Sequence, residues 1–451
     1  MNRLTAPLVR VFVRWMPDAF AVALLLTFVT FALSVTVAGY PAQAALTSWG
    51  DNFWNLLKFT NQITLTLLLG YVFANTPPIH RALLAIASLA RTPVSAYLLA
   101  CAITGTCALF SWGLSLIAAG IMARAIGESC RKQGIAVHYP LLVASSCSGF
   151  VIWHQGLSSS IGLSLATPGH FLEARLGLIP ISDTLLTGWN IGVALFVLVS
   201  MPFVMAALRP RDAREIEAIP DHLVAKNTST DAADSAPPRE PGTDKTPAQR
   251  FEDSRLTTWL IVAAGAAFMV THFVVRDRGL DLNTLNFAFL WLGMLLAGSP
   301  IRYVRIIVDG GRIAAPFLLQ YPFYAGIAGL MGDSGLARML VEFFVSVSSP
   351  ETLPLFGFLS GGLLNLFIPS GGGQWAVQGP IMMAAAERLG ADLPRVAMSV
   401  ALGDQWTNLI QPLAIIPVLT IAGIGAREIM GYTFVALLWS GIIFSLALLL
   451  F

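Results

Sequence analysis

The sequence predicts an all-α polytopic membrane protein made of two inverted-topology repeats, each with a re-entrant hairpin and a broken transmembrane helix. Of its 451 residues, 56% are apolar and only 12% are charged, and the mean hydropathy is +0.71. A soluble domain carries about 25% charged residues. Small-residue breaks interrupt long apolar sequence at 109–122 (LFSWGLSLIAAGIM) and 367–382 (FIPSGGGQWAVQGPIM). Unwound backbone at membrane depth is tolerated only beside protein or a water-filled cavity, and paired breaks indicate a secondary transporter's binding site.

The N-terminal residues predict a retained membrane helix over 1–39. Arg3, Arg10 and Arg14 precede an apolar run at 19–37, which is longer than the roughly 7–15 residues of a secretory signal. The alternative is a cleaved signal, since Ala-Gln-Ala at 42–44 resembles a cleavage site. Basic residues favour the cytoplasmic side, so the N-terminus is expected in the cytoplasm.

The two halves can be superposed along the sequence. Asp51 and Asp309 lie 258 positions apart, and so do Gly113 and Gly371. Basic loops place the start of the Asp51 span outside and that of the Asp309 span inside, so the repeats are predicted to run in opposite directions, with Phe451 outside. The predicted organisation is a first repeat over 40–208 with its hairpin near 110–127, a disordered cytoplasmic linker over 209–255, connecting transmembrane helices over 256–299, and a second repeat over 300–451 with its hairpin near 369–387.

The hairpin of the second half carries the first candidate site. Three consecutive glycines are costly in a helix interior, at about 1 kcal/mol each relative to alanine. We interpret them as a hairpin tip whose free N–H groups attract an anion; the alternative is a kink that allows close helix packing. Substrate contacts are predicted from Ser370, Gly371, Gly372, Gly373, Gln374 and Trp375.

An acidic residue at membrane depth marks the second candidate site. Asp404, Asn408 and Gln411 follow one another at spacings of four and three, which places them on one helical face. Buried acids in membranes mark ion or proton routes. Asp404 and Asn408 are predicted to couple transport to a cation, and Asn408 and Gln411 to contact substrate. The alternative is a polar packing cluster in which Asp404 pairs with Arg388 or Arg395.

Hydroxyl-bearing and small residues predict the matching site in the first half. His154, within WHQGLSSS, is interpreted either as a proton relay or, more simply, as a hydrogen-bonding residue. Substrate contacts are predicted from Trp112, Gly113, Ser115, Ser158, Ser159 and Thr167.

The remaining chemistry argues against an enzyme. The sequence has no dinucleotide loop, Walker motif, zinc spacing or nucleophile elbow. No arginine cluster accompanies the candidate site, which favours a small monoanion over a polyanion. We expect no cofactor apart from a coupling sodium ion or proton, and no nucleic-acid partner. The cysteines are expected to be small buried hydrophobes; they are Cys101, Cys107, Cys130 and Cys147.

Motifs along nearly the whole chain resemble the short-chain fatty acid transporter family (AtoE type) of the ion-transporter superfamily. They are RWMPD at 14–18, WGDNFWNLL at 49–57, ATPG at 166–169, PFYAGI at 322–327, PSGGG at 369–373 and QWTN at 405–408. The resemblance implies uptake of butyrate- or acetoacetate-like monocarboxylates across a bacterial inner membrane, two inverted repeats with hairpins, use of sodium or protons, and a homodimer. Residues 153–160 depart from the glycine-rich family pattern, which re-tunes the first-half site.

These observations predict a secondary active transporter that moves short-chain fatty acids by alternating access, coupled to a cation. The alternative is an uncoupled channel or a carrier for another small organic anion.

Overall fold

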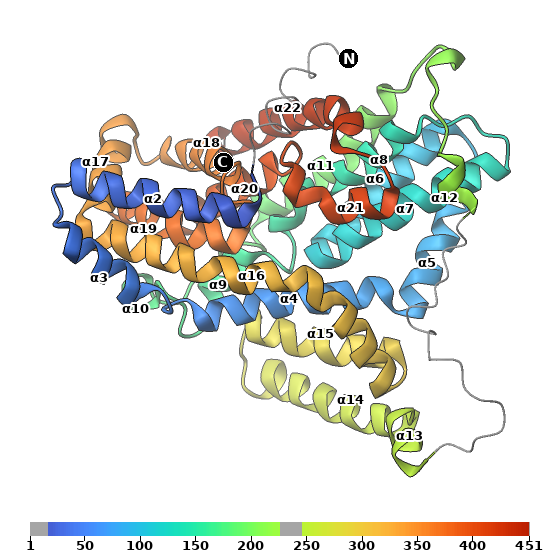
Figure 1. The fold of residues 1–451 in the computed structure, drawn as a ribbon, viewed down its shortest axis with the longest axis horizontal. Coiled ribbons are helices and arrows are strands. Elements are labelled where there is room, and N and C mark those ends of the chain that lie inside the picture. The colour runs from blue at the N-terminus through green and yellow to red at the C-terminus, as the bar shows by residue number, and fades with distance from the viewer. Residues whose placement is uncertain (1–16, 226–245, 451) are drawn as a thin grey trace.

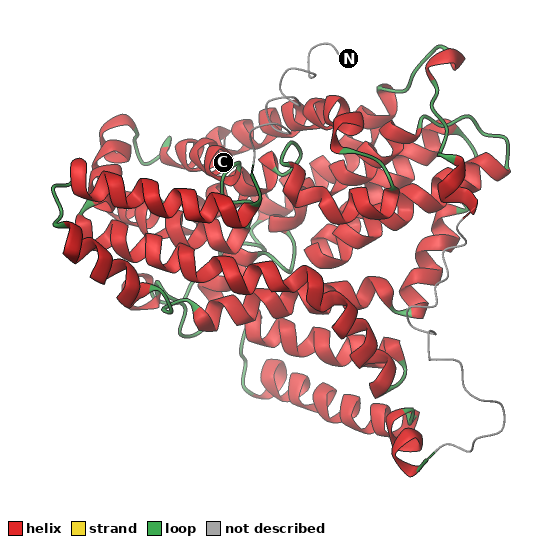
Figure 2. Ribbon diagram, in the orientation of Figure 1, coloured by secondary structure: helices red, strands yellow, loops and turns green. Residues whose placement is uncertain are grey.

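Helices form nearly all of the described backbone (Figure 2). The computed structural model describes residues 17–225 and 246–450, and no β-strand occurs in these two ranges. The long helices run roughly side by side along the longest axis of the molecule (Figure 1). The fold is therefore all-α, as predicted.

Several helices are long and apolar enough to cross a membrane. In the described ranges there are six, and seven if the bent pair α3 (Ala42–Asn52) and α4 (Leu57–Asn75), with a 50° bend, counts as one span. The six are α6 (Pro93–Phe110), α7 (Trp112–Lys132), α11 (Gly188–Ala207), α14 (Arg255–Val270) with its π-helical end Thr271–Val275, α16 (Pro300–Ser334) and α22 (Ala426–Leu450). Shorter apolar helices include α2 (Ala19–Thr36), α15 (Leu282–Ala297) and α18 (Leu353–Asn365).

The first half contains a helical hairpin and a broken helix. α6 and α7 pack against each other and meet at Ser111, whose side chain caps α7. The break therefore lies at the start of the segment predicted near 110–127, and Gly113 lies inside the first turn of α7. The other elements are α5 (Pro77–Ala87), α8 (Tyr139–Gly149), the 3₁₀ helix Phe150–Gln155, α9 (Ser160–Ala166) and α10 (Glu173–Leu176).

The second half repeats this arrangement of elements. α18 ends shortly before α19 (Gly371–Leu389), which Ser370 caps, so the break lies at the start of the segment predicted near 369–387. α20 (Leu393–Thr407) is separated from α21 (Ile416–Ala422) by irregular backbone and the 3₁₀ helix Pro412–Ile415, which agrees with the predicted broken helix. α17 (Leu336–Val347) links α16 to this hairpin.

The predicted disordered linker over 209–255 is too broad at both ends. Residues 209–225 include the 3₁₀ helix Ala213–Glu215 and α12 (Asp221–Ala225), and α13 (Pro247–Glu252) begins the return. Ile219 and Leu223 are buried, and this apolar contact orders a segment whose composition is otherwise polar. Residues 226–245 lie outside the described ranges.

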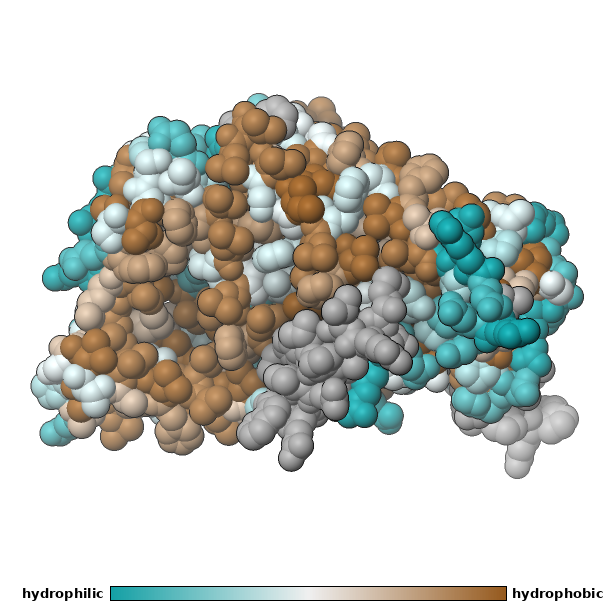
Figure 3. Space-filling model, turned by 90° about the horizontal axis from the view of Figure 1, so that it is seen from above, coloured by the Kyte–Doolittle hydropathy of each residue, from teal (hydrophilic) through white to brown (hydrophobic). Residues whose placement is uncertain are grey.

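The surface shows where lipid is expected. In Figure 3 hydrophobic residues cover the middle of the visible face, and hydrophilic residues gather toward its ends. Large apolar side chains are exposed on several helices, such as Phe28 (71%), Phe203 (62%) and Leu260 (65%). A soluble monomer rarely exposes large contiguous apolar patches. The chain is a multi-pass membrane protein.

Candidate functional site

One cavity of about 610 Å³ lies where the two hairpins meet the long helix α16. Its wall comes from α4, α7, the 3₁₀ helix after α8, α16, the N-terminus of α19 and α21. The predicted site residues in its lining are Trp112, Ser370, Gly371, Gly372 and Asn408. The cavity therefore brings both hairpins and the broken helix α20 to one place.

The N-terminus of α19 forms part of this wall. Ser370 Oγ accepts a hydrogen bond from the Gly373 N–H (3.4 Å) and lies 2.9 Å from Tyr321 Oη. A Cβ on Gly372 would lie 2.5 Å from Tyr321 Oη, and one on Gly371 would collide with the imidazole of His154. Neither glycine has a positive φ. Close approach of neighbouring side chains, rather than backbone strain, thus requires glycine here.

The next residues of α19 turn away from the cavity. Gly373 packs against the ring of Tyr324, and Trp375 is completely buried. The Gln374 side-chain amide donates to Gly361 O (3.0 Å) and Gln378 Oε1 (2.9 Å). Gly373, Gln374 and Trp375 therefore support the hairpin from behind, and the structure does not bring them to the cavity.

The predicted site residues of the first half also divide into those that line the cavity and those that pack behind it. Trp112 lines the cavity, and its ring lies 5.8 Å from that of Trp153. The Trp112 backbone N–H donates to Ser158 Oγ (2.9 Å). Gly113 packs against the backbone of α4, and Ser115 Oγ donates to Thr104 O (2.9 Å) within the hairpin. Only Trp112 of the predicted first-half residues reaches the cavity lining.

Ser159 and Thr167, two other predicted site residues, accept hydrogen bonds from backbone N–H groups, and Ser159 also contacts His154. Ser159 Oγ caps α9 at Gly162 N–H (3.2 Å) and lies 3.0 Å from His154 Nδ1. Thr167 Oγ1 accepts from the Leu282 N–H (3.0 Å) and ties the end of α9 to α15. Thr167 thus has a packing role outside the cavity.

Asp404 pairs with His154. The two side chains are completely buried, and His154 Nε2 lies 3.2 Å from Asp404 Oδ2. The His154 backbone N–H also donates to Gln405 Oε1 (2.8 Å), so two contacts join these segments. Neither arginine considered as a partner takes this role, because Arg395 donates to Leu448 O (2.7 Å) and Arg388 is exposed.

Further buried polar side chains lie on α18, α19 and α20. Asn365 Nδ2 donates to Thr407 Oγ1 (2.9 Å) and Asn408 Oδ1 (2.8 Å). Asp404 Oδ1, Asn365 Oδ1 and Gln374 Oε1 are buried and accept no hydrogen bond from any described residue. Gln411 is also buried, but it is not in the cavity lining. Within the described ranges no group of three or more His, Cys, Asp or Glu side chains could hold a metal ion.

Several cavity residues were not predicted from the sequence. Phe317, Tyr321 and Arg312 all line the cavity from α16. The motif QYPFYAG at 320–326 combines three aromatic residues with one proline and one glycine. This unusual composition is the feature of the sequence that could have pointed to Tyr321. No local signal distinguishes Arg312 from the other basic residues at the start of α16.

Comparisons with known proteins agree with this architecture. The family model described as "Short chain fatty acid transporter" matches residues 1–451. A putative short-chain fatty acid transporter of Escherichia coli (strain K12) is 38% identical over 451 residues and both chains are covered completely. A putative short-chain fatty acid transporter of Haemophilus influenzae is 34% identical over 442 residues, or 96% of each chain.

Solved structures show a similar fold at low sequence identity. The YdaH transporter of Alcanivorax borkumensis has a TM-score of 0.61 at 13% identity, covering 95% of this chain and 98% of that one. MtrF of Neisseria gonorrhoeae, described as illuminating a class of antimetabolite efflux pumps, has a TM-score of 0.58 at 15% identity, covering 96% and 95%. The fold is that of a membrane transporter, and the match along its full length shows that this chain belongs to the short-chain fatty acid transporter family.

Proposed function

We propose that this protein is a secondary active transporter that moves butyrate- or acetoacetate-like monocarboxylates across a bacterial inner membrane by alternating access. The observation that carries the proposal is one cavity in which the N-terminus of α19 meets α4, α7 and α16. Family membership supports a transport function rather than catalysis.

The cavity suits a short acid with one charge. The first N–H groups of a helix lack intrahelical partners and attract anions, and Gly371 and Gly372 supply them at the cavity wall. A carboxylate would bind there, and the acyl chain would pack on apolar walls. These walls include Ile63, Leu67, Leu116, Ile117 and Phe317.

Coupling to a cation is proposed at Asp404. Sodium would use Asp404 Oδ1 with the amide oxygens of Asn365 and Gln374, which are buried and accept no hydrogen bond from the described residues. Broken helices hold coupling ions through such oxygen atoms in other transporter folds. A proton would instead be shared along the 3.2 Å contact between Asp404 and His154. Both versions rest on the same buried carboxylate.

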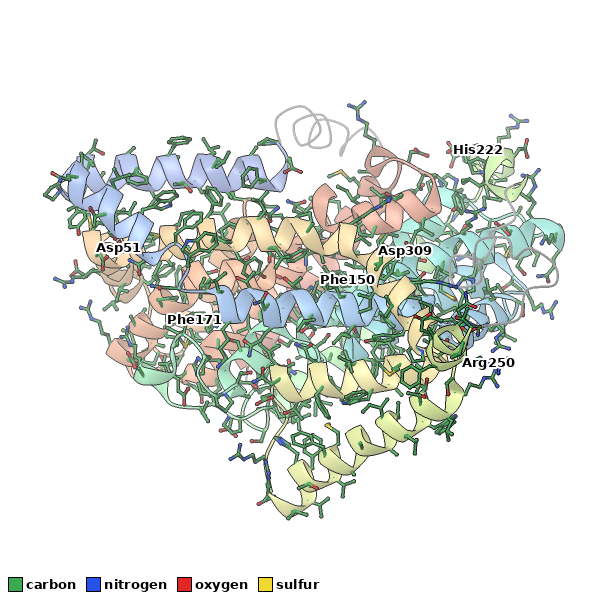
Figure 4. The ribbon with its side chains drawn as sticks, turned by 60° about the horizontal axis from the view of Figure 1, so that its bottom comes forward. Asp51, Phe150, Phe171, His222, Arg250 and Asp309 are labelled. Carbon is green, nitrogen blue, oxygen red and sulfur yellow. The ribbon has the colours of Figure 1, made fainter. Side chains whose placement is uncertain are left out.

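Alternating access is proposed to follow from two hairpins of opposite orientation. Ser111 and Ser370 each cap the second helix of a hairpin. In Figure 4 Asp51 lies toward one end of the molecule, and His222 and Arg250, which belong to the 209–255 linker, lie toward the other. Basic residues near that second end support a cytoplasmic linker. One hairpin would then enter from each side of the bilayer.

Counterflow in proteoliposomes tests the function directly. Purified protein is reconstituted with unlabelled butyrate inside, and labelled butyrate is added outside. A carrier accumulates label transiently, whereas an uncoupled channel equilibrates without overshoot. Imposed sodium and pH gradients then identify the coupling ion, and competition by propionate, acetoacetate and succinate tests the preference for monoanions. Absence of overshoot with every acid would contradict the carrier function.

A further inference from the structure

The cavity wall carries one basic side chain with no assigned role. Arg312 is the basic residue and Asp18 the acidic residue among the cavity-lining side chains of the described chain. Arg312 lies on the membrane helix α16 and is exposed. It forms no ion pair with any described residue, so its guanidinium donors remain available.

Neither Asp18 nor Asp309 forms an ion pair with this guanidinium. Asp18 Oδ1 accepts a hydrogen bond from the Phe20 N–H (2.9 Å) and caps α2. Asp309 precedes Arg312 by three positions on α16 and is exposed. Such helical neighbours contribute only about 0.2–0.5 kcal/mol. Arg312 therefore keeps its capacity to bind an anion.

Arg312 lies far from the α19 terminus along the same wall. It precedes Tyr321, which contacts Ser370, by nine residues on α16. At 1.5 Å per residue this separates the two positions by about 13 Å. A four-carbon acid is shorter than this, and it fills only part of a cavity of about 610 Å³. The cavity thus has room for two successive positions of the substrate.

The wall between these two positions is mostly apolar. Ile313, Pro316 and Phe317 line it along α16. An acyl chain can lie on this surface while its carboxylate is held at either end. Tyr71 and Asn75 of α4 lie in the lining with Arg312 and provide polar groups on the opposing helix.

We propose that Arg312 forms a second carboxylate subsite, at the mouth of the cavity, which binds the monocarboxylate before or after it occupies the α19 terminus. This inference rests on the proposed function and extends it to a residue outside both hairpins. Arginine binds a carboxylate through two parallel N–H···O hydrogen bonds, which lysine cannot reproduce. Because the subsite lies at one end of the cavity, it controls affinity from one side of the membrane.

Sided transport assays test the subsite. Proteoliposomes with uniform protein orientation are assayed by labelled butyrate exchange, and the half-saturating concentration is measured separately at each face. R312Q is expected to raise this value about tenfold at the face where the cavity opens, since a charge-assisted hydrogen bond is lost, and to leave the other face unchanged. R312K should give an intermediate value. The expected tenfold change should shrink at high salt, because salt screens exposed charges.

The matched control is R305Q, which removes a charge from the same helix outside the cavity lining. An R312Q variant that behaves like R305Q, or that changes both faces equally, would overturn the subsite while leaving the carrier function intact. Butyrate binding is measured in parallel by thermal stabilisation of the wild-type protein in detergent. If the wild-type protein neither exchanges nor binds butyrate, the proposed function fails and the subsite fails with it.

Discussion

The contact between Asp404 and His154 joins the two halves of the chain, and both side chains are buried from solvent. A lone ionised carboxylate in such a place would be very costly, so it needs a partner, a proton or a cation. His154 Nε2 supplies the partner at 3.2 Å, and Ser159 Oγ lies 3.0 Å from its Nδ1. This chain of contacts orients the imidazole, and the second carboxylate oxygen remains open to an ion.

Replacing Asp404 with Asn tests its proposed role. The variant keeps the shape and some hydrogen bonding but removes the charge. Gradient-driven uptake should fall about tenfold or more, while butyrate exchange should stay within about threefold of wild type, because exchange does not require the empty carrier to return. Uptake and counterflow are measured in the same proteoliposomes. Unchanged accumulation would exclude Asp404 from coupling and favour a purely structural pair.

Gly372 tests the hairpin tip at a single residue. In Gly372→Val, the added Cβ would lie 2.5 Å from Tyr321 Oη and 3.2 Å from the ring of Phe59. Overpacking costs about 1–3 kcal/mol, and the displaced tip should abolish transport while the protein still inserts. Gly192→Val is the control, since no atom lies within 4 Å of its Cβ. Normal transport by the Gly372 variant would mean that the glycine run serves packing only.

Residues 213–225 of the linker form a distinct element that packs on the ends of α7, α8 and α22. The Tyr139 N–H donates to Glu217 O (2.7 Å), and the Glu217 N–H donates to His138 Nδ1 (3.1 Å). Since Nδ1 accepts this bond, Nε2 of the neutral ring carries the proton and donates to Tyr432 Oη (2.9 Å). Leu223 packs against Gly423 at the end of α21. The packing of residues 213–225 on the helix ends thus depends on a neutral His138 ring.

Acid should loosen this element. Burial lowers the pKa of His138 below its ordinary value of 6.5, and Glu217 and Glu215 offset this only in part. When residues 213–225 detach, His138 is exposed and binds a proton more readily than in the packed state. The packing of these residues is therefore complete above pH 6.5 and weakens as the pH falls below it. Losing the contact to Glu217 costs about 1 kcal/mol. Hydrogen exchange of residues 213–225 should be faster at pH 5.5 than at 7.5, and His138→Asn should remove most of that difference.

The whole molecule contains helices of two kinds, those with broad lipid exposure and those in the interior. α14 is largely exposed, whereas most of α7 and all of α8 are buried. Proline and glycine breaks occur in the interior helices, where neighbouring side chains satisfy the freed backbone. If the repeats are inverted as proposed, the two hairpins enter the bilayer from opposite faces.

Reporter fusions test this topology. The N-terminus and the 209–255 linker are expected in the cytoplasm and a reporter after Phe451, which lies outside the described residues, is expected on the outer side. An alkaline phosphatase fusion after residue 451 should be active, and a green fluorescent protein fusion at that position should be dark. A control insertion between residues 226 and 245 should show the reverse. A fluorescent C-terminal fusion would contradict the inverted repeat.

The helices, their breaks and the family follow from local sequence, because hydropathy, glycine runs and proline act over short distances along the chain. The sequence also identified Ser370, Gly371, Gly372, Asn408 and Trp112 as cavity residues. Apolar patterning inside a buried hairpin has no polar face, so it does not show which side of α19 meets the cavity. The sequence prediction therefore includes Gly373, Gln374 and Trp375, which are not in the cavity lining.

Which distant residues meet depends on how the helices pack. His154 and Asp404 are 250 positions apart, and no local pattern links an imidazole in one half to a carboxylate in the other. The packing of α20 against the 3₁₀ helix after α8 brings them together. Arg312 likewise gains its place in the cavity wall from the packing of α16 on α4. Local sequence sets each helix, whereas long-range packing selects the face that each helix presents, and the site is made of those faces.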